Sequence, residues 1–258
     1  MSLLAVVYHL VPEAPVLVAY NRDEKRDFLC PTPSIQSGKP RVLASIDPQT
    51  GGTYLGMNQN GLFVGLVRRR KYGVVQNPRS RGVLCRELLR LTSARQAVDH
   101  CLEELHTGEY DGVNFVIADR ECGWVVHSGN ETEVVELKPG LSIIGKNDVD
   151  DYKDERVQMA RRLLTLQTLD SPVKFLAVAS KVLARGPGLP GRPSMVVRSE
   201  VESTVSSTLI SLGSKPRDAI YQYSNGSPDQ AKFEDYSPLL RDILSRGLRE
   251  ARAKAATS

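Results

Sequence analysis

The chain has 258 residues, of which 41% are apolar and 25% are charged, and its formal net charge at pH 7 is +4. This length can bury a sizeable core in one large domain or two small ones, and the composition is typical of a soluble globular protein. The small net charge and the scattered basic residues argue against nucleic acid as a partner. The basic run at 68–71 is interpreted as a solvated strand end that could favour an anionic ligand.

The cysteines show no metal-binding pattern. Cys30, Cys85, Cys101 and Cys122 include no C-x-x-C pair, and no His lies at a zinc-like spacing from them. So few cysteines favour a reducing compartment, and we expect a cytoplasmic protein. The apolar N-terminal stretch has no basic n-region, and Glu13 and two prolines interrupt it, so it is not expected to be a signal peptide or a membrane span.

Strands dominate the first part of the chain. Apolar runs at 3–9 and 15–21, separated by VPEAP, predict a hairpin. A proline-rich loop follows at 28–41. The next segments, VLASID, GTYLGMN and LFVGLVR, predict three more strands, and Asn60-Gly61 is a strong turn signal between the last two.

Two helices follow, one from Ser80 to Leu91 and one that starts at a Ser93 cap. Four strands, two helices, two strands and a C-terminal helix are then predicted at 114–120, 123–129, 132–138, 141–145, 154–169, 172–185, 205–212, 217–223 and 236–258.

This element order predicts an α+β fold. Most links between strands resemble hairpins, so the sheets should be mainly antiparallel. Two such sheets packed face to face, with helices outside each, form a four-layer α/β/β/α sandwich. We expect one domain over 1–235, with the helix of 236–258 packed on it and ending in a polar tail.

A charged block follows the second apolar run. Arg22 could simply pair with Asp23 or Glu24 in a solvated turn. If the first two strands form a hairpin, however, this block lies beside the start of the first strand, at Ser2. The block would then surround a chemically useful position.

Removal of Met1 is expected when residue two is small, as Ser2 is. The new N-terminus would carry a hydroxyl nucleophile and an α-amine, and an α-amine with a reference pKa of about 8 can act as a general base. A nearby arginine could stabilise an anion, and a nearby aspartate could orient the amine. Many proteins begin Met-Ser for no catalytic reason, so the structural interpretation stays open.

Several motifs resemble those of one family. NRDE at 21–24 and GGTYLGMNQNGLFVGL at 51–66 have the order and spacing of the NRDE family, also called the transport and Golgi organisation protein 2 family. The resemblance continues through 80–82, 112–119, the region of Asn147 and 205–212. It implies an N-terminal-nucleophile-hydrolase-like fold, with two stacked antiparallel sheets between helical layers.

The resemblance also implies roles for individual residues. In the related choloylglycine and penicillin acylases, an N-terminal cysteine attacks an amide with support from an arginine, an aspartate and asparagines. By analogy, Ser2 would be nucleophile and base, and Asp23 would orient its amine. Arg22 would bind or stabilise negative charge, and Asn147 would donate to the oxyanion. No metal or organic cofactor is needed. The candidate substrate-binding residues are Asn21, Thr53, Tyr54 and Arg68.

Three positions depart from the family pattern. Ser2 stands where members typically have Cys, Arg68 aligns with an asparagine, and Val205 stands where many members have Arg. Serine is a poorer nucleophile than a thiolate. The first hypothesis is a hydrolase of an amide or another small acyl substrate.

The departures also support a non-catalytic carrier that uses the same pocket for a lipid-like, acyl or haem-like ligand. Eukaryotic members of the family are linked to secretory-pathway organisation, lipid metabolism and haem handling. The basic C-terminal helix is the one hint of a third possibility, a protein interaction module. His127 has no carboxylate partner in the sequence pattern and is interpreted as structural.

Overall fold

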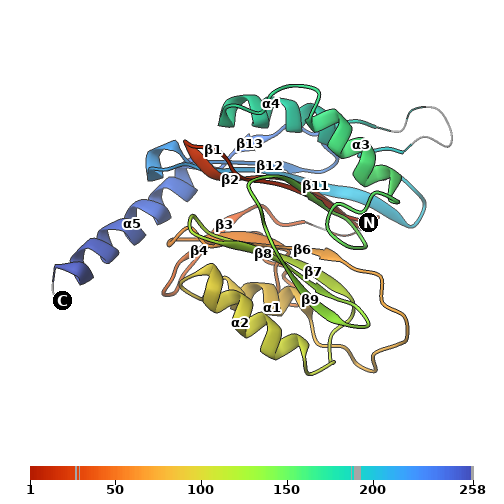
Figure 1. The fold of residues 1–258 in the computed structure, drawn as a ribbon, viewed down its shortest axis with the longest axis horizontal. Helices are drawn as coiled ribbons and strands as arrows, with labels where there is room; N and C mark the ends of the chain where they lie inside the picture. Colours follow the sequence, from red (N-terminus) through yellow and green to blue (C-terminus); the bar gives the residue numbers. More distant parts are fainter. Residues whose placement is uncertain (27, 29, 187, 189–192, 257–258) are drawn as a thin grey trace.

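The computed structural model describes residues 1–26, 28, 30–186, 188 and 193–256. They form four layers, in which α3 and α4 cover one sheet, a second sheet packs beneath it, and α1 and α2 cover the far face (Figure 1). The prediction of a four-layer sandwich of two antiparallel sheets is confirmed.

The first sheet contains the hairpin of β1 and β2 with which the chain begins. Its strand order is β10-β1-β2-β11-β12-β13, and every pairing is antiparallel. The bounds of its strands are β1 Leu3–Val11, β2 Ala14–Lys25, β10 Gly140–Ile144, β11 Glu202–Leu212, β12 Ile220–Asn225 and β13 Glu234–Asp235.

The second sheet follows the chain as a meander. Its order is β3-β4-β5-β6-β7-β8-β9, again antiparallel throughout. The bounds are β3 Ser34–Gln36, β4 Val42–Ala44, β5 Leu55–Asn58, β6 Phe63–Arg68, β7 Val113–Ala118, β8 Gly123–Ser128 and β9 Thr132–Glu136. The predicted turn at Asn60-Gly61 joins β5 to β6, and Gly61 has a positive φ of 86° that favours glycine.

Serine side chains cap the N-termini of the first two helices. Ser93 Oγ accepts from Gln96 N, which confirms the predicted N-cap, and Ser80, expected as the first residue of its helix, is the N-cap of α1 because its Oγ accepts from Val83 N. The helices are α1 Arg81–Leu88, α2 Ala94–Leu105, α3 Glu155–Leu164, α4 Pro172–Leu183 and α5 Ser237–Ala255. None of the helices in the described ranges is long and apolar enough to cross a membrane.

The largest difference from the sequence-based expectation is the length of β2. The strand was predicted to end at Asn21, but it continues to Lys25, so the charged block lies inside the sheet rather than beyond it. Residues 21–24 pair with β11, and all four are buried. The sequence pattern alone suggested a strand end because charged residues are rarely buried without partners.

Smaller differences occur where elements are short. The strands β3 and β13 were not predicted, and the strand expected from residue 217 begins at Ile220 because Pro216–Asp218 form a 3-10 turn. The helix predicted over 154–169 ends at Leu164. Short strands with little periodicity carry too few residues for a pattern to be recognised.

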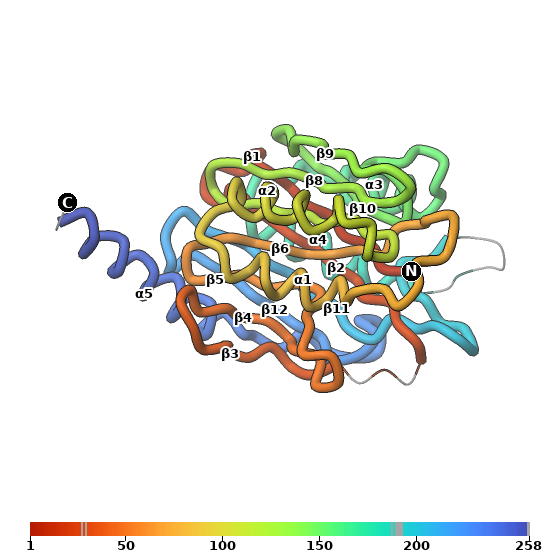
Figure 2. The backbone as a smooth tube through the Cα atoms, turned by 90° about the horizontal axis from the view of Figure 1, so that it is seen from below, coloured from red at the N-terminus to blue at the C-terminus, as the bar shows by residue number. Residues whose placement is uncertain are grey.

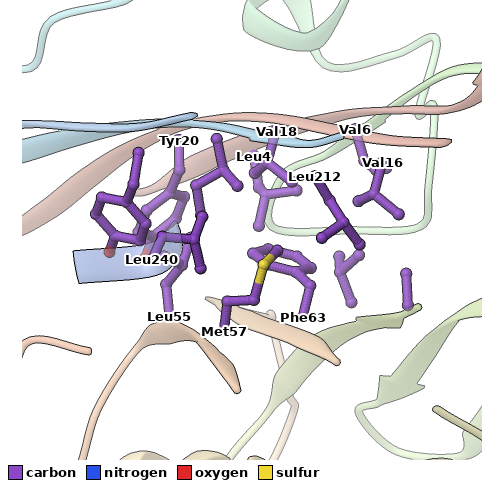
Figure 3. Close-up of a cluster of buried hydrophobic side chains, with 14 of the residues drawn as sticks. Leu4, Val6, Val16, Val18, Tyr20, Leu55, Met57, Phe63, Leu212 and Leu240 are labelled. Atoms are coloured by element: carbon purple, nitrogen blue, oxygen red, sulfur yellow. The ribbon is translucent and has the colours of Figure 1, made fainter. Parts of the chain in front are cut away.

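Three apolar layers hold the sandwich together. One lies between the sheets, one between the second sheet and α1 and α2, and one between the first sheet and α3 and α4. Figure 3 shows the layer between the sheets, where side chains of both sheets point toward each other, among them Leu4, Val18, Tyr20, Met57 and Phe63.

The helix α5 closes one end of this layer. Leu240, Ile243 and Leu244 enter the inter-sheet core from it. Figures 1 and 2 both place α5 at the opposite end of the sandwich from the N-terminus. The N-terminal residues therefore lie where the two sheets are not covered by this helix.

Candidate functional site

The β1–β2 hairpin places the start of the chain beside the charged block. Leu3 pairs with Asn21 in the antiparallel register, so Ser2 lies opposite the residues that follow Asn21. The backbone N–H of Asp23 donates to Ser2 Oγ over 3.0 Å. Ser2 is 8% exposed. The hairpin thus brings together two of the four predicted catalytic residues.

The carboxylate of Asp23 is fully buried and has three partners. Thr204 Oγ1 donates to Oδ1 over 2.6 Å, and Arg156 Nη1 lies 2.7 Å from Oδ2. The α-amine of Met1 lies 3.3 Å from the same Oδ2. A buried carboxylate needs such charged and hydrogen-bonding partners to remain ionised. Asp23 is therefore arranged to hold a cation at the N-terminus.

Arg156 was not among the predicted site residues. It is the second residue of α3, and its guanidinium also donates to the carbonyls of Met1 and, over 2.6 Å, Met195. The sequence pattern placed it on a helix but gave no indication that this helix reaches β2. The antiparallel pairing of β10 with β1 is what brings the helix that follows β10 to this position.

A β-bulge in β11 shapes the other side of the site. Asp23 pairs with Thr204 and Arg22 pairs with Ser206, so Val205 is the extra residue between them. Bulges of this kind redirect side chains and are frequent near functional sites. The Val205 position, where the family often has arginine, thus lies directly beside Asp23.

Strand alternation sends Arg22 to the opposite face of β2 from Asp23. Its guanidinium lies between the sheets, with Cζ 3.3 Å from the ring centroid of Tyr54 and 4.5 Å from that of Phe28. Nη1 donates to Cys30 Sγ over 3.1 Å. Burial disfavours the charge, but neighbouring groups, Cys30 first, raise the pKa of Arg22 above its ordinary value. The structure therefore places Arg22 on the opposite face of β2 from the Asp23 carboxylate. The side chain of Ser2, which lies across from Arg22 in the hairpin and interacts with Tyr20, is on the same face as Arg22.

Glu24 is also buried and points toward Arg22. It forms an ion pair with Arg68, and Arg22 Nη2 lies 3.6 Å from its other carboxylate oxygen. Arg68, which was predicted to bind substrate, therefore neutralises a buried carboxylate of β2. The side chain of Arg68 is still 40% exposed, so one side of it faces solvent.

The remaining predicted residues bind other parts of the chain. Asn21 Nδ2 donates to the carbonyls of Leu183 and Met195 on the helix side of the first sheet. Thr53 Oγ1 donates to Ser45 O over 2.8 Å.

Asn147 lies on the segment after β10. Its Nδ2 donates to Asp151 Oδ2 over 2.7 Å, and its carbonyl accepts from Asn114. These contacts hold Asn147 in place, and none of the hydrogen bonds among the described residues joins it to Ser2.

A buried polar network fixes the segment that carries Asn147. Asn114 Nδ2 donates to Gly145 O and Asn147 O, and Asn114 Oδ1 lies 2.8 Å from His127 Nδ1. The backbone N–H of Val149 donates to His127 Nε2. Burial and the nearby Arg69 lower the pKa of His127 to about 4, so the imidazole is neutral. This network supports the structural interpretation of His127.

Space around these residues is unevenly distributed. The cavity between the sheets that touches Arg22 and Tyr54 measures about 20 Å³, which is room for about one water molecule. Larger grooves lie elsewhere among the described residues, with volumes of about 880 Å³ beside α5, about 740 Å³ beside Asn147 and about 360 Å³ between α3 and α4. The space between Arg22 and Tyr54 is therefore too small for a lipid or haem.

Three solved structures show the same fold. An N-acylethanolamine-hydrolyzing acid amidase orthologue from Caenorhabditis elegans is 14% identical, with 81% of this chain and 92% of that chain covered and a TM-score of 0.53. Penicillin V acylase from Agrobacterium tumefaciens is 11% identical, with 87% and 83% covered and a TM-score of 0.50. A variant of conjugated bile acid hydrolase from Clostridium perfringens is 13% identical, with 91% and 92% covered and a TM-score of 0.55.

Sequence comparison identifies the family. No curated protein matches the chain. A family model described as Transport and Golgi organisation 2 matches residues 1–212. The structural neighbours have the N-terminal-nucleophile-hydrolase fold, as the sequence resemblance implied. The chain belongs to the Transport and Golgi organisation 2 family.

Proposed function

We propose that the protein is an N-terminal nucleophile hydrolase that acts on an amide or another small acyl substrate. The observation that supports this function is the contact between the N-terminus and Asp23. Ser2 Oγ lies 3.0 Å from Asp23 N, and the carboxylate of Asp23 lies 3.3 Å from the α-amine of the chain. Removal of Met1 would give Ser2 its own α-amine next to this carboxylate.

The reaction follows from that arrangement. Ser2 Oγ attacks the substrate carbonyl carbon while its proton passes to the α-amine, and the amine returns the proton to the leaving nitrogen as the C–N bond breaks. Water then hydrolyses the acyl-serine ester by the same proton path. Asp23 orients the amine, and Thr204 and Arg156 hold Asp23 in place.

The structure also supports a different distribution of roles from the one that the family analogy implied. Arg22 lies on the other face of β2 from the Asp23 carboxylate, so we assign the positive charge that supports Asp23 to Arg156. Asn147 would donate to the oxyanion only after its side chain leaves Asp151.

The test begins with the intact mass of untagged protein from its own cells. Loss of Met1 is the expected result. The protein is then assayed against a panel of an N-acylethanolamine, a conjugated bile acid and penicillin V, the compounds that name the structural neighbours. We expect Ser2→Ala to lower turnover by about 100-fold or more, whereas Ser2→Cys retains it. Met1 retained on active protein, or full activity of Ser2→Ala, would contradict the proposal.

The groove beside α5 favours a second candidate function, a carrier of an amphipathic anion such as a lipid-like acid or haem. Its volume is about 880 Å³, within the range of ligand sites. Leu244, Gly247 and Leu248 line it from α5, and Arg90 and Arg120 supply positive charge. This candidate relocates the carrier site away from Arg22 and Tyr54, where the cavity is too small.

Native mass spectrometry after titration with a long-chain fatty acid, and separately with haem, tests the carrier function. One bound molecule in the protein, reduced about 10-fold in affinity in Arg90→Glu, is expected because one cation is replaced by an anion. Arg162→Glu on α3, outside the groove, is the control. Equal effects of both variants would argue against this groove as the site.

We also propose that the protein acts in the cytoplasm. All four cysteines, Cys30, Cys85, Cys101 and Cys122, are free thiols. Free thiols are typical of reducing compartments. Fractionation of cells that express the untagged protein is the direct measurement.

A further inference from the structure

Cys30 differs from the other cysteines because a cation contacts it. Arg22 Nη1 lies 3.1 Å from Cys30 Sγ, and Ser206 Oγ lies 3.4 Å from the same sulfur. Cys30 is 8% exposed, so its sulfur is mainly surrounded by protein. A guanidinium next to a thiol favours the thiolate, which is the reactive form of cysteine.

The guanidinium of Arg22 retains unused hydrogen-bonding capacity. Arg22 is only 4% exposed, and within the described part of the chain its Nε and Nη2 atoms have no hydrogen-bond partner. The nearest carboxylate, Glu24, lies 3.6 Å away and is shared with Arg68. Stacking on Tyr54 also stabilises the cation. Arg22 therefore has donors available for an anionic form of Cys30.

A small cavity adjoins this pair. Arg22, Tyr54, Ser206 and Tyr223 line it, and its volume of about 20 Å³ admits a molecule of about the size of water. Arg22 and Ser206 each contact both the cavity and the sulfur of Cys30. The cavity therefore provides a small space beside two of the groups that contact the sulfur.

The three other cysteines have the opposite environment. Cys85 and Cys101 are fully buried, and burial raises the pKa of both thiols. Cys122 is more exposed than Cys30, but partial burial and the carboxylate of Asp119 raise its pKa. Exposure alone would make Cys122 the first cysteine to react, whereas electrostatics favours Cys30.

We propose that Cys30 is an oxidation site, at which Arg22 stabilises the thiolate and a small hydroperoxide converts it to sulfenic acid. The thiolate sulfur attacks one peroxide oxygen, the S–O bond forms and the O–O bond breaks. Sulfur loses two electrons and one peroxide oxygen becomes the sulfenic hydroxyl. The other oxygen leaves as hydroxide when the reagent is hydrogen peroxide, or as an alcohol, after taking a proton from solvent, when it is an organic hydroperoxide. Arg22 and Asp23 point to opposite faces of β2, so this site does not use the carboxylate that is proposed to orient the α-amine.

The experiment compares the four cysteines within one protein. Native full-length protein receives hydrogen peroxide at a few molar equivalents, and a 1,3-diketone that traps sulfenic acid is added as the protein is denatured. Peptide mass spectrometry then locates the adduct. We expect Cys30 to carry about 10-fold more adduct than Cys122, although it is less exposed. Faster labelling of Cys122, or equal labelling of all four, would overturn the proposal.

Variants separate the effect of charge from that of access. Arg22→Gln should lower labelling of Cys30 about 10-fold, and Arg22→Lys should retain most of it, because only the former removes the positive charge. Cys30→Ser should abolish the adduct at this position.

If Arg22→Gln does not fold, Glu24→Gln is the second variant. It removes a nearby negative charge and should raise labelling of Cys30 several-fold. Unchanged labelling in Glu24→Gln would also contradict the proposal.

Discussion

Asp23 and Arg156 form an ion pair between β2 and α3, with Arg156 Nη1 2.7 Å from Asp23 Oδ2. The carboxylate is fully buried, and the two residues are 133 positions apart in the sequence. Arg156 also contacts the carbonyls of Met1 and Met195. A single side chain thus connects the start of the chain, β2 and the segment before β11, so the geometry of the N-terminus depends on α3.

Arg156→Met should destabilise the protein because it leaves the Asp23 carboxylate without its strongest partner. Removal of one member of a buried ion pair typically costs about 3–5 kcal/mol. We expect the lower end, about 3 kcal/mol, because Thr204 and the α-amine remain. Urea denaturation followed by circular dichroism measures the change.

Arg162→Met is the matched control for this variant. Arg162 lies on the same helix and is exposed. Its replacement should change the free energy of unfolding by less than about 0.5 kcal/mol. Equal losses in the two variants would show that Arg156 acts through helix α3 in general and not through Asp23.

Long periodic elements were predictable from the sequence. The β1–β2 hairpin and the Ser93 cap follow from alternation and capping preferences, which are local properties. The same pattern predicted the contact of Ser2 with the NRDE block, because a hairpin fixes which residues lie opposite each other.

Contacts between distant segments were not predictable in this way. Asp23 pairs with Arg156 and not with Arg22 because the side chains of Asp23 and Arg22 point to opposite faces of β2. The strand was expected to end at Asn21, so strand alternation was not expected at residues 22 and 23. The pairing of Arg68 with Glu24 depends on the stacking of the two sheets. Neither relationship has a counterpart in local periodicity.

The Arg68–Glu24 pair should behave as a coupled unit. Arg68→Met leaves a buried carboxylate whose remaining cation is 3.6 Å away, and we expect a loss of about 3 kcal/mol in the free energy of unfolding. Adding Glu24→Gln removes the uncompensated charge and should restore about half of that loss or more. A double-mutant cycle measures the coupling by denaturation. Strict additivity of the two changes would contradict the ion pair.

His127 should make the protein less stable in acid. Its pKa is about 4 in the folded state, because burial and Arg69 disfavour the charged form, and its ordinary value is about 6.5. Between these values the unfolded state binds the proton and the folded state does not, so the free energy of unfolding falls as pH drops from about 6.5 to 4. The full contribution is about 3 kcal/mol.

The variant His127→Gln isolates this contribution from that of the carboxylates. It cannot titrate in this range, so the difference in unfolding free energy between wild type and variant should shrink as the pH is lowered from 7 to 4. Denaturation curves at three or four pH values provide the measurement. A difference that does not depend on pH would show that His127 is not held neutral.

Gly247→Ala tests how closely α5 packs on the turn between β5 and β6. In a free helix, replacing glycine by alanine stabilises by about 1 kcal/mol. Here an added Cβ would lie 2.0 Å from the carbonyl oxygen of Gln59, so the helix must move away. We expect a net loss of about 1–3 kcal/mol in the free energy of unfolding.

Gly82→Ala in α1 is the control, since its Cβ would meet Thr53 O at 3.3 Å, and we expect a change of less than about 1 kcal/mol. Stabilisation by Gly247→Ala would mean that α5 does not rest on this turn, and the proposed packing of 236–258 on the domain of 1–235 would fail.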